Sequence, residues 1–275
     1  MSRKLAILLL IITGVLWSTG GLLIKLIPWS PISIAGIRSG LSALIIYLYR
    51  KPYSKGFGRN IWAGAFCYSV MVVSFVFANK ITASGNVILI QYAAPIYVAL
   101  FGYSFLGEKA SKIDWITIAI IIFGLSCFFY EDLSLKQKWG NVLAIFSGLG
   151  FAGLTLFMRK EKNANPIDCV LLGNLITFVI CLPFYFTGVT MEATPWLSIT
   201  FLGFVQLGLA YILFSTAIKY VNALDAIIYP VIEPLFNPLL TFIFIGEQMS
   251  QTALIGGFLV ITGVIGRGYL SEASN

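Results

Sequence analysis

The sequence predicts an all-α integral membrane protein of ten transmembrane helices, built from two inverted five-helix repeats. Three observations lead to this fold class. The 275 residues are 59% hydrophobic and only 11% charged, with a mean hydropathy of +0.91, whereas a soluble domain carries charge on about a quarter of its positions. The apolar residues fall in runs of about 20, the length that crosses the hydrocarbon core of a bilayer. Finally, two segments of the chain, 139 residues apart, are similar to each other.

Ten apolar runs are expected to cross the membrane as helices joined by short polar segments. In chain order they are residues 5–27, 31–49, 61–78, 82–106, 113–130, 140–158, 167–187, 195–218, 222–245 and 252–270. The first run follows Arg3 and Lys4, as a signal peptide would, but no small-residue cleavage site follows it and nine more runs do. We therefore predict that it is a membrane helix.

The basic residues between the runs predict the orientation, because cytoplasmic loops carry an excess of Lys and Arg. Thirteen of the 18 fall on one side: Arg3, Lys4, Arg50, Lys51, Lys55, Arg59, Lys109, Lys112, Arg159, Lys160, Lys162, Lys219 and Arg267. Four fall on the other side, Lys25, Lys80, Lys136 and Lys138, and Arg38 lies inside a run. We expect a multi-pass protein of the cytoplasmic membrane with both termini in the cytoplasm. The net charge of +7 is therefore a topology signal, and no nucleic-acid partner is expected.

The internal repeat aligns residues 80–124 with residues 219–263 without a gap. The identical pairs include Lys80/Lys219, Ile88/Ile227, Pro95/Pro234, Leu100/Leu239, Gly107/Gly246, Glu108/Glu247, Ser111/Ser250, Ile122/Ile261 and Gly124/Gly263. Each repeat has an odd number of spans, five, so its second copy enters the membrane from the opposite side. We predict one transmembrane domain with repeats at 1–134 and 135–275. Inverted repeats are typical of secondary transporters, whose substrate site lies near the bilayer midplane; a duplicated membrane protein with another role is the alternative.

Several chemistries are excluded by composition. The chain has no histidine, so it has no Ser-His-Asp triad and no His-ligated metal. Its four cysteines stand singly in apolar runs and are expected to pack without forming disulfides. No GxxxxGK[ST] segment is present for ATP hydrolysis. We predict no enzyme activity and no cofactor or metal, with coupling to a substrate gradient, to exchange or to an ion such as a proton.

The family resemblance depends on short motifs in a fixed order. They are Gly14-Val15-Leu16-Trp17-Ser18, Ser30-Pro31 followed by Arg38, Gly-Glu at the ends of spans four and nine, Glu233-Pro234, and Gly140-Asn141 before span six. With these motifs the chain resembles the drug/metabolite transporter (DMT) superfamily, in its ten-helix EamA-type branch. The resemblance covers nearly the whole chain. It implies secondary transport of small metabolites, frequently amino acids and often as export.

Glu233 is the sharpest candidate for the substrate site, because an ionised side chain in the middle of a span costs on the order of 2.5–3.5 kcal/mol. Asp225, Tyr229, Glu233, Asn237 and Thr241 recur every four residues and predict one polar stripe along a helix. Glu233 would recognise an amine or exchange a proton. The alternative is a carboxylate that is neutralised by protonation or by Arg38, the other mid-span charge, and that only fixes helix packing. For Arg38 a structural role is favoured over binding a substrate carboxylate.

The prolines and aromatic residues near these charges complete the predicted site. Pro95 and Pro234 each free a carbonyl in mid-helix, and they are candidate hinges for alternating access or static kinks. Gln91 and Tyr92 precede the first of them. Trp17 predicts an aromatic wall, suited to an amine through cation–π contact. Gln206, Tyr211 and Tyr68 are weaker candidates, and Glu108 and Glu247 at helix ends are read as caps or gating contacts, with capping favoured.

The sequence thus predicts a transporter that moves a small amino acid or amine-containing compound by alternating access, with export favoured. The cavity would be lined from spans one, three, four, six, eight and nine. The predicted substrate-binding residues are Trp17, Gln91, Tyr92, Tyr229, Glu233 and Asn237. Other partners would be the lipid bilayer and a coupling proton or exchange substrate, and the protein would be a monomer or homodimer. Import of a quaternary amine such as choline, a membrane channel and a membrane-embedded enzyme remain the alternatives.

Overall fold

The protein is helical throughout the part of the chain that the structure describes. This structure, a computed structural model, describes residues 1–50, 57–130, 137–185, 188–236 and 251–273. Eight helical segments in those ranges are long and apolar enough to cross a membrane. Their outer surface carries large apolar side chains, such as Tyr47, Leu48 and Phe66, that would meet water in a soluble protein. The predicted all-α membrane fold is therefore confirmed.

The eight segments correspond to eight of the predicted spans. They are α1 with α2 (Arg3–Trp17, Gly20–Leu26), α3 (Pro31–Tyr49), α4 (Arg59–Ile81), α5 with α6 (Ser84–Gln91, Ala94–Leu106), α8 (Lys138–Lys160), α9 with the short η1 (Ile167–Cys181, Leu182–Phe184), α10 with η2 and α11 (Ala193–Phe201, Leu202–Leu209, Ala210–Ala217), and α14 (Gln251–Ala273). Of the other two predicted spans, α7 (Lys112–Phe128) has 17 residues. The ninth span begins with α12 (Ala223–Ile228) and η3 (Tyr229–Ile232), and residues 237–250 lie outside the described ranges.

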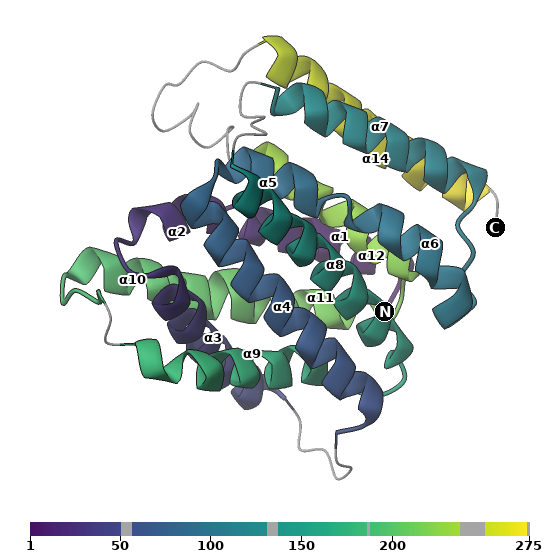
Figure 1. Ribbon diagram of the computed structural model, residues 1–275. Coiled ribbons are helices and arrows are strands. Elements are labelled where there is room, and N and C mark those ends of the chain that lie inside the picture. The colour runs from purple at the N-terminus through teal and green to yellow at the C-terminus, as the bar shows by residue number, and fades with distance from the viewer. Residues whose placement is uncertain (51–56, 131–136, 186–187, 237–250, 274–275) are drawn as a thin grey trace.

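Contacts between helices follow a two-fold relation between the repeats. Equivalent helices pack on each other, α3 on α9 and α7 on α14, and the second pair lies side by side along one edge of the molecule in Figure 1. Other contacts come in symmetric pairs, in which α1 corresponds to α8, α3 to α9, and α4 to η2 with α11. The contact of α1 with α11 is matched by that of α8 with α4, and the contact of α3 with η2 by that of α9 with α4. Arg50, after α3, pairs with Asp168 at the start of α9, and Asp114, near the start of α7, pairs with Arg267 near the end of α14. Equivalent helices are thus antiparallel, as an inverted repeat requires.

The α7–α14 contact depends on glycine, because only small residues allow membrane helices to approach with their backbones touching. A Cβ atom added to Gly256 would lie 2.3 Å from the carbonyl oxygen of Gly124 and 2.4 Å from the amide nitrogen of Phe128. A side chain at position 256 would therefore force the two helices apart.

The fourth span is interrupted beside a proline. Helix α5 ends at Gln91 and α6 begins at Ala94, with Tyr92 and Ala93 between them. Pro95 has no N–H group, so the carbonyl of Gln91 lacks its usual helical donor. A Cβ on Gly148 of α8 would lie 3.0 Å from that carbonyl oxygen. The absence of a side chain at position 148 lets α8 pack directly against the broken turn.

The ninth span is also broken at its prolines. Helix α12 gives way at Tyr229 to the 3-10 turn η3. Pro234 cannot donate to the carbonyl of Pro230, four residues earlier. The hydroxyl of Tyr92 lies 3.0 Å from this carbonyl oxygen and is within reach to donate a hydrogen bond to it. A side chain from the first repeat can thereby satisfy a backbone group that a proline of the second repeat leaves free.

Candidate functional site

A cavity lies between the two repeats. Its lining residues are Trp17, Arg38, Met71, Val72, Phe75, Gln91, Phe151, Gln206, Leu207, Tyr211 and Glu233. They come from all six spans that were predicted to line the cavity. Span two was not among those six, and it contributes Arg38. The cavity is largely apolar and carries a few polar groups, as small-molecule sites do.

One wall of the cavity is aromatic. The ring centroid of Trp17 lies 5.6 Å from that of Phe151, 5.1 Å from that of Tyr211 and 5.5 Å from that of Phe214. Trp17 is the last residue of α1 and is buried. These edge-to-face and tilted contacts hold its indole ring in one orientation beside the cavity.

Glu233 reaches the same cavity and has a defined partner. Its side chain is 7% exposed, and its Oε2 atom accepts a hydrogen bond of 2.7 Å from the hydroxyl of Tyr92. Tyr92 is 1% exposed and is not one of the lining residues. The structure therefore places Tyr92 behind Glu233, where its hydroxyl orients the carboxylate.

Two glutamines add polar atoms to the lining. The amide nitrogen Nε2 of Gln91 donates to the Ser147 hydroxyl at 2.8 Å, and this hydroxyl donates to the Met71 carbonyl at 3.1 Å. The Gln206 side chain packs closely against Gly20. Its Nε2 atom lies 2.7 Å from the position that a Cβ atom on this glycine would take. Its Oε1 atom is buried and has no hydrogen-bond partner among the described residues.

Arg38 is the most deeply buried charge of the cavity, with 1% of its surface exposed. Its Nε and Nη1 atoms have no hydrogen-bond partner in the described part of the chain. The ion pair with Glu233 that the sequence offered as an alternative does not form, although both residues line the cavity. The π-helical segment η2 helps to position Arg38: a Cβ on Gly203 would lie 3.0 Å from the Arg38 carbonyl oxygen.

The predicted polar stripe does not face the cavity along its whole length. Asp225 pairs with Arg267, and the Arg267 guanidinium lies 6.0 Å from the ring centre of Tyr229. Tyr229 is buried there and is not a lining residue, whereas Glu233 is. The 3-10 turn between them has three residues per turn, so residues four apart no longer share one face. Asn237, and Thr241 beyond it, lie outside the described residues.

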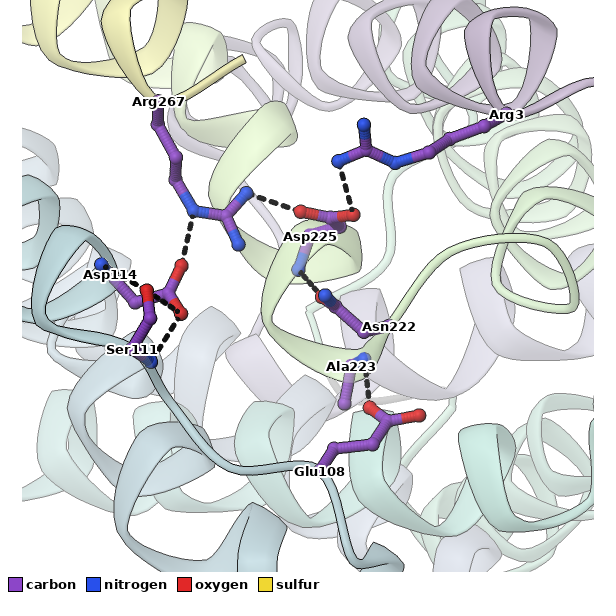
Figure 2. A network of polar contacts seen from close by, with 8 residues as sticks. All are labelled: Arg3, Glu108, Ser111, Asp114, Asn222, Ala223, Asp225 and Arg267. Carbon is purple, nitrogen blue, oxygen red and sulfur yellow. Dashed lines mark hydrogen bonds and ion pairs between the residues drawn. The ribbon is translucent and has the colours of Figure 1, made fainter. Parts of the chain in front are cut away.

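An ion-pair network lies away from the cavity, where α1, α7, α12 and α14 meet (Figure 2). Asp225 is 1% exposed and lies between two arginines, pairing with Arg267 and, at 3.1 Å, with Arg3. Arg267 also pairs with Asp114 at 2.8 Å. Four helices from both repeats are thus joined by ion pairs at one end of the bundle, and Asp225 and Arg267 in these pairs are buried.

Glu108 lies at the same end of the bundle as this network, as Figure 2 shows. One of its carboxylate oxygens lies 2.7 Å from Arg159 Nε, and the other accepts a hydrogen bond of 2.7 Å from the backbone N–H of Ala223. That N–H is the first of α12, so Glu108 caps the start of this helix, where a carboxylate is favoured. Gly107 ends α6 in the left-handed conformation, with φ of 74°. The repeated pair, Gly246-Glu247, lies outside the described residues.

Sequence reasoning missed part of this arrangement. The lining residues Met71, Val72, Phe75, Phe151 and Leu207 gave no signal, because the chain has 22 phenylalanines and apolar residues in every span. Arg3 and Arg267 counted only as topology signals. The hint to their second role was Asp225, an acidic residue within an apolar run.

The structure offers little for metal chemistry in its described ranges. No group of three or more Cys, Asp or Glu side chains there could hold a metal ion. The four cysteines are free thiols, and Cys169 and Cys181 are buried. The described lining of the cavity offers one carboxylate, one guanidinium, two amide groups and aromatic faces for recognition.

The chain is similar to a family of transporters and to individual proteins named as transporters. Residues 4–130 and 138–267 match the EamA-like transporter family. YwfM of Bacillus subtilis, an uncharacterized transporter, is 26% identical over 96% of this chain and 94% of its own, and the pseudopaline exporter CntI of Pseudomonas aeruginosa is 21% identical over 84% of each. An uncharacterized transporter of Archaeoglobus fulgidus is 27% identical over 70% of each chain. One crystal structure superposes with a TM-score of 0.81 at 16% identity, covering 100% of both chains, which shows a shared fold.

Proposed function

Because this chain belongs to the EamA-like transporter family, we propose that it exports a small amine-containing metabolite, such as an amino acid, by alternating access around the central cavity. The observation that carries the proposal is the position of Glu233. A carboxylate within a span is costly, yet this one lines a cavity beside an aromatic wall and has no ion-pair partner among the described residues. A substrate ammonium group would supply the missing positive charge.

The neighbours of Glu233 suit an ammonium ligand. The Tyr92 hydroxyl holds one carboxylate oxygen, which leaves the other oxygen for the substrate. The indole face of Trp17 attracts a cation through its quadrupole, a contact worth roughly 0.5–2 kcal/mol. A cation between these two groups would exchange its water shell for a carboxylate and a ring.

Alternating access would use the ion-pair network as its gate. The described ion pairs all lie at helix ends that the sequence predicts to be cytoplasmic. Closure of this end by Asp225, Arg3 and Arg267 would leave the cavity accessible only from the other side. The broken turns at Pro95 and Pro234 are the proposed bending points, because they already lack continuous helical hydrogen bonding.

Proton exchange is the proposed energy source. Tyr92 has one hydroxyl proton and two acceptors within reach, Glu233 and the carbonyl of Pro230. When Glu233 takes up a proton, it can donate to the Tyr92 oxygen while Tyr92 donates to Pro230. A proton and a substrate ammonium would then compete for one carboxylate, so inward proton movement drives outward substrate movement. Export is supported by the relative named as an exporter.

Counterflow in liposomes tests the function. The purified protein is reconstituted, loaded with one unlabelled compound from a panel of amino acids and amines that includes choline, and exposed to the same compound in radiolabelled form. We expect saturable exchange of at least one compound without chemical change. A channel would not show saturable exchange, and an enzyme would change the compound chemically. Glu233→Gln should reduce exchange by about tenfold or more, equivalent to 1.4 kcal/mol.

The matched control is Glu192→Gln, which removes an exposed carboxylate before α10 and should leave exchange unchanged. The proposal fails if the wild-type protein exchanges no member of the panel. It also fails if size-exclusion chromatography shows that the Glu233→Gln protein is folded and this protein exchanges substrate like the wild type.

A further inference from the structure

We propose that Arg38 is a substrate-binding residue that holds a carboxylate, so the transported compound is a small zwitterion with its ammonium group at Glu233. This inference rests on the proposed function and deepens it, because it names the substrate class. It differs from the structural role that the sequence favoured for Arg38.

The first argument is the burial of a charge without a partner. A guanidinium group stays protonated in proteins, and removing it from water costs several kcal/mol unless an opposite charge and hydrogen bonds compensate. Arg38 is 1% exposed, and its Nε and Nη1 atoms have no hydrogen-bond partner in the described residues. A purely structural arginine would be paired, as Arg50 is with Asp168 at 2.5 Å and Arg159 with Glu108 at 2.7 Å.

The second argument is the geometry of the group. Arg38 lines the same cavity as Glu233, so an anion in the cavity can reach it. A carboxylate accepts two parallel hydrogen bonds from a guanidinium, which makes this pair among the strongest and most directional in proteins. Nε with Nη2, or Nη1 with Nη2, can form such a pair of donors.

The third argument is the charge balance of the cavity. Arg38 and Glu233 carry one charge each, of opposite sign, and they do not pair with each other. A zwitterion satisfies both groups, whereas a simple amine leaves Arg38 unpaired and a simple carboxylate leaves Glu233 unpaired. The buried Oε1 atom of Gln206 adds one more acceptor for the ammonium group.

The rest of the lining describes the remainder of the substrate. Trp17, Phe75 and Phe151 are aromatic, and Met71, Val72 and Leu207 are aliphatic or thioether side chains. Such a surface favours an apolar side chain that branches from the carbon bearing the two charged groups. The substrate class is therefore an α-amino acid, or a similar zwitterion, with an aromatic or large aliphatic side chain.

Matched ligands test the role of the carboxylate. Phenylalanine, methionine and leucine are each compared with the decarboxylated amine and with the deaminated acid, as competitors in the counterflow assay. For the wild-type protein we expect at least one amino acid to compete about tenfold or more better than both of its partial analogues, and choline to compete as weakly as the amines.

Substitution of Arg38 tests the residue itself. Arg38→Gln should reduce the preference for the amino acid over its amine to near unity, while Arg38→Lys keeps part of it, because lysine supplies charge without the bidentate geometry. Arg59→Gln, which removes an exposed arginine at the start of α4, is the control and should keep the full preference.

The outcomes separate this inference from the function on which it rests. If the wild-type protein exchanges amines as well as amino acids, or the Arg38→Gln protein keeps the wild-type preference, transport stands and the role of Arg38 is wrong. If no compound is exchanged at all, the proposed function itself is wrong. If the Arg38→Gln protein does not fold, the inference is decided by whether the wild-type protein prefers an amino acid over its decarboxylated and deaminated analogues.

Discussion

The hydroxyl of Tyr92 lies 2.7 Å from a carboxylate oxygen of Glu233 and 3.0 Å from the carbonyl oxygen of Pro230. Tyr92 belongs to the first repeat and Glu233 to the second. Because the hydroxyl carries a single proton, it can donate to only one of these acceptors at a time. This contact joins the broken turns of the two repeats directly to the charge that lines the cavity.

Replacing Tyr92 with phenylalanine is expected to impair transport while leaving the fold intact. The change removes a hydrogen bond to a charged group, worth about 1.5–3 kcal/mol, and leaves the ring in place. Counterflow exchange should fall by about tenfold or more. Tyr103→Phe, at an exposed position of α6, is the control. Equal exchange by the Tyr92→Phe and Tyr103→Phe proteins would show that Tyr92 does not position Glu233.

Substitutions of Trp17 are expected to separate packing from recognition. Trp17→Ala deletes a buried ring that contacts Phe151, Tyr211 and Phe214, and such truncations cost about 3–5 kcal/mol of stability. Trp17→Phe keeps an aromatic ring but has a weaker quadrupole, so it should remain folded and lose several-fold in apparent affinity. Thermal unfolding in detergent and concentration-dependent counterflow measure the two effects. Wild-type affinity in Trp17→Phe would argue against a cation–π contact.

Neutralising Asp225 is expected to destabilise the protein strongly. Asp225→Asn leaves Arg267 and Arg3 without their shared buried partner, and breaking a buried pair costs about 3–5 kcal/mol. The midpoint of thermal unfolding should drop by several degrees. Lys138→Gln, an exposed charge at the start of α8, should leave the midpoint unchanged. A midpoint for Asp225→Asn equal to that of Lys138→Gln would mean that the network contributes no stability.

Two glycines of α14 provide a matched test of helix packing. Gly256→Ala places a Cβ 2.3 Å from the carbonyl oxygen of Gly124, whereas a Cβ on Gly266 meets no atom within 4 Å. Alanine is the better helix former by about 1 kcal/mol, so Gly266→Ala should be neutral or stabilising. Gly256→Ala should lower the thermal midpoint despite that gain. Similar midpoints for both proteins would contradict the close α7–α14 contact.

Much of the fold could be predicted from the chain because membrane helices obey local rules. Runs such as 31–49 and 140–158 correspond to α3 and α8 (Pro31–Tyr49 and Lys138–Lys160) within a few residues. The bilayer requires about 20 apolar residues for each span, so composition alone marks these helices. The five-span repeat then predicts the inversion that the antiparallel α3–α9 and α7–α14 pairs display.

The candidate site was harder to predict, as Asp225 and Tyr229 illustrate. A uniform helix would place both on one face with Glu233. The 3-10 turn at Tyr229–Ile232 rotates Glu233 away from them, so Asp225 and Tyr229 meet Arg267 while Glu233 meets the cavity. Hydropathy does not reveal a change from 3.6 to three residues per turn.

The sequence by itself determined the membrane class, the inverted repeat and the charges that lie in mid-span, because all three follow from which residues occur at which spacing. Only the tertiary structure decided which charges are paired. Arg267 meets Asp225 and Asp114, whereas Arg38 shares a cavity with Glu233 without pairing. The physical reason is that pairing depends on distances between residues far apart in the chain, and the Coulomb energy and hydrogen bonding of buried groups change steeply over a few ångströms.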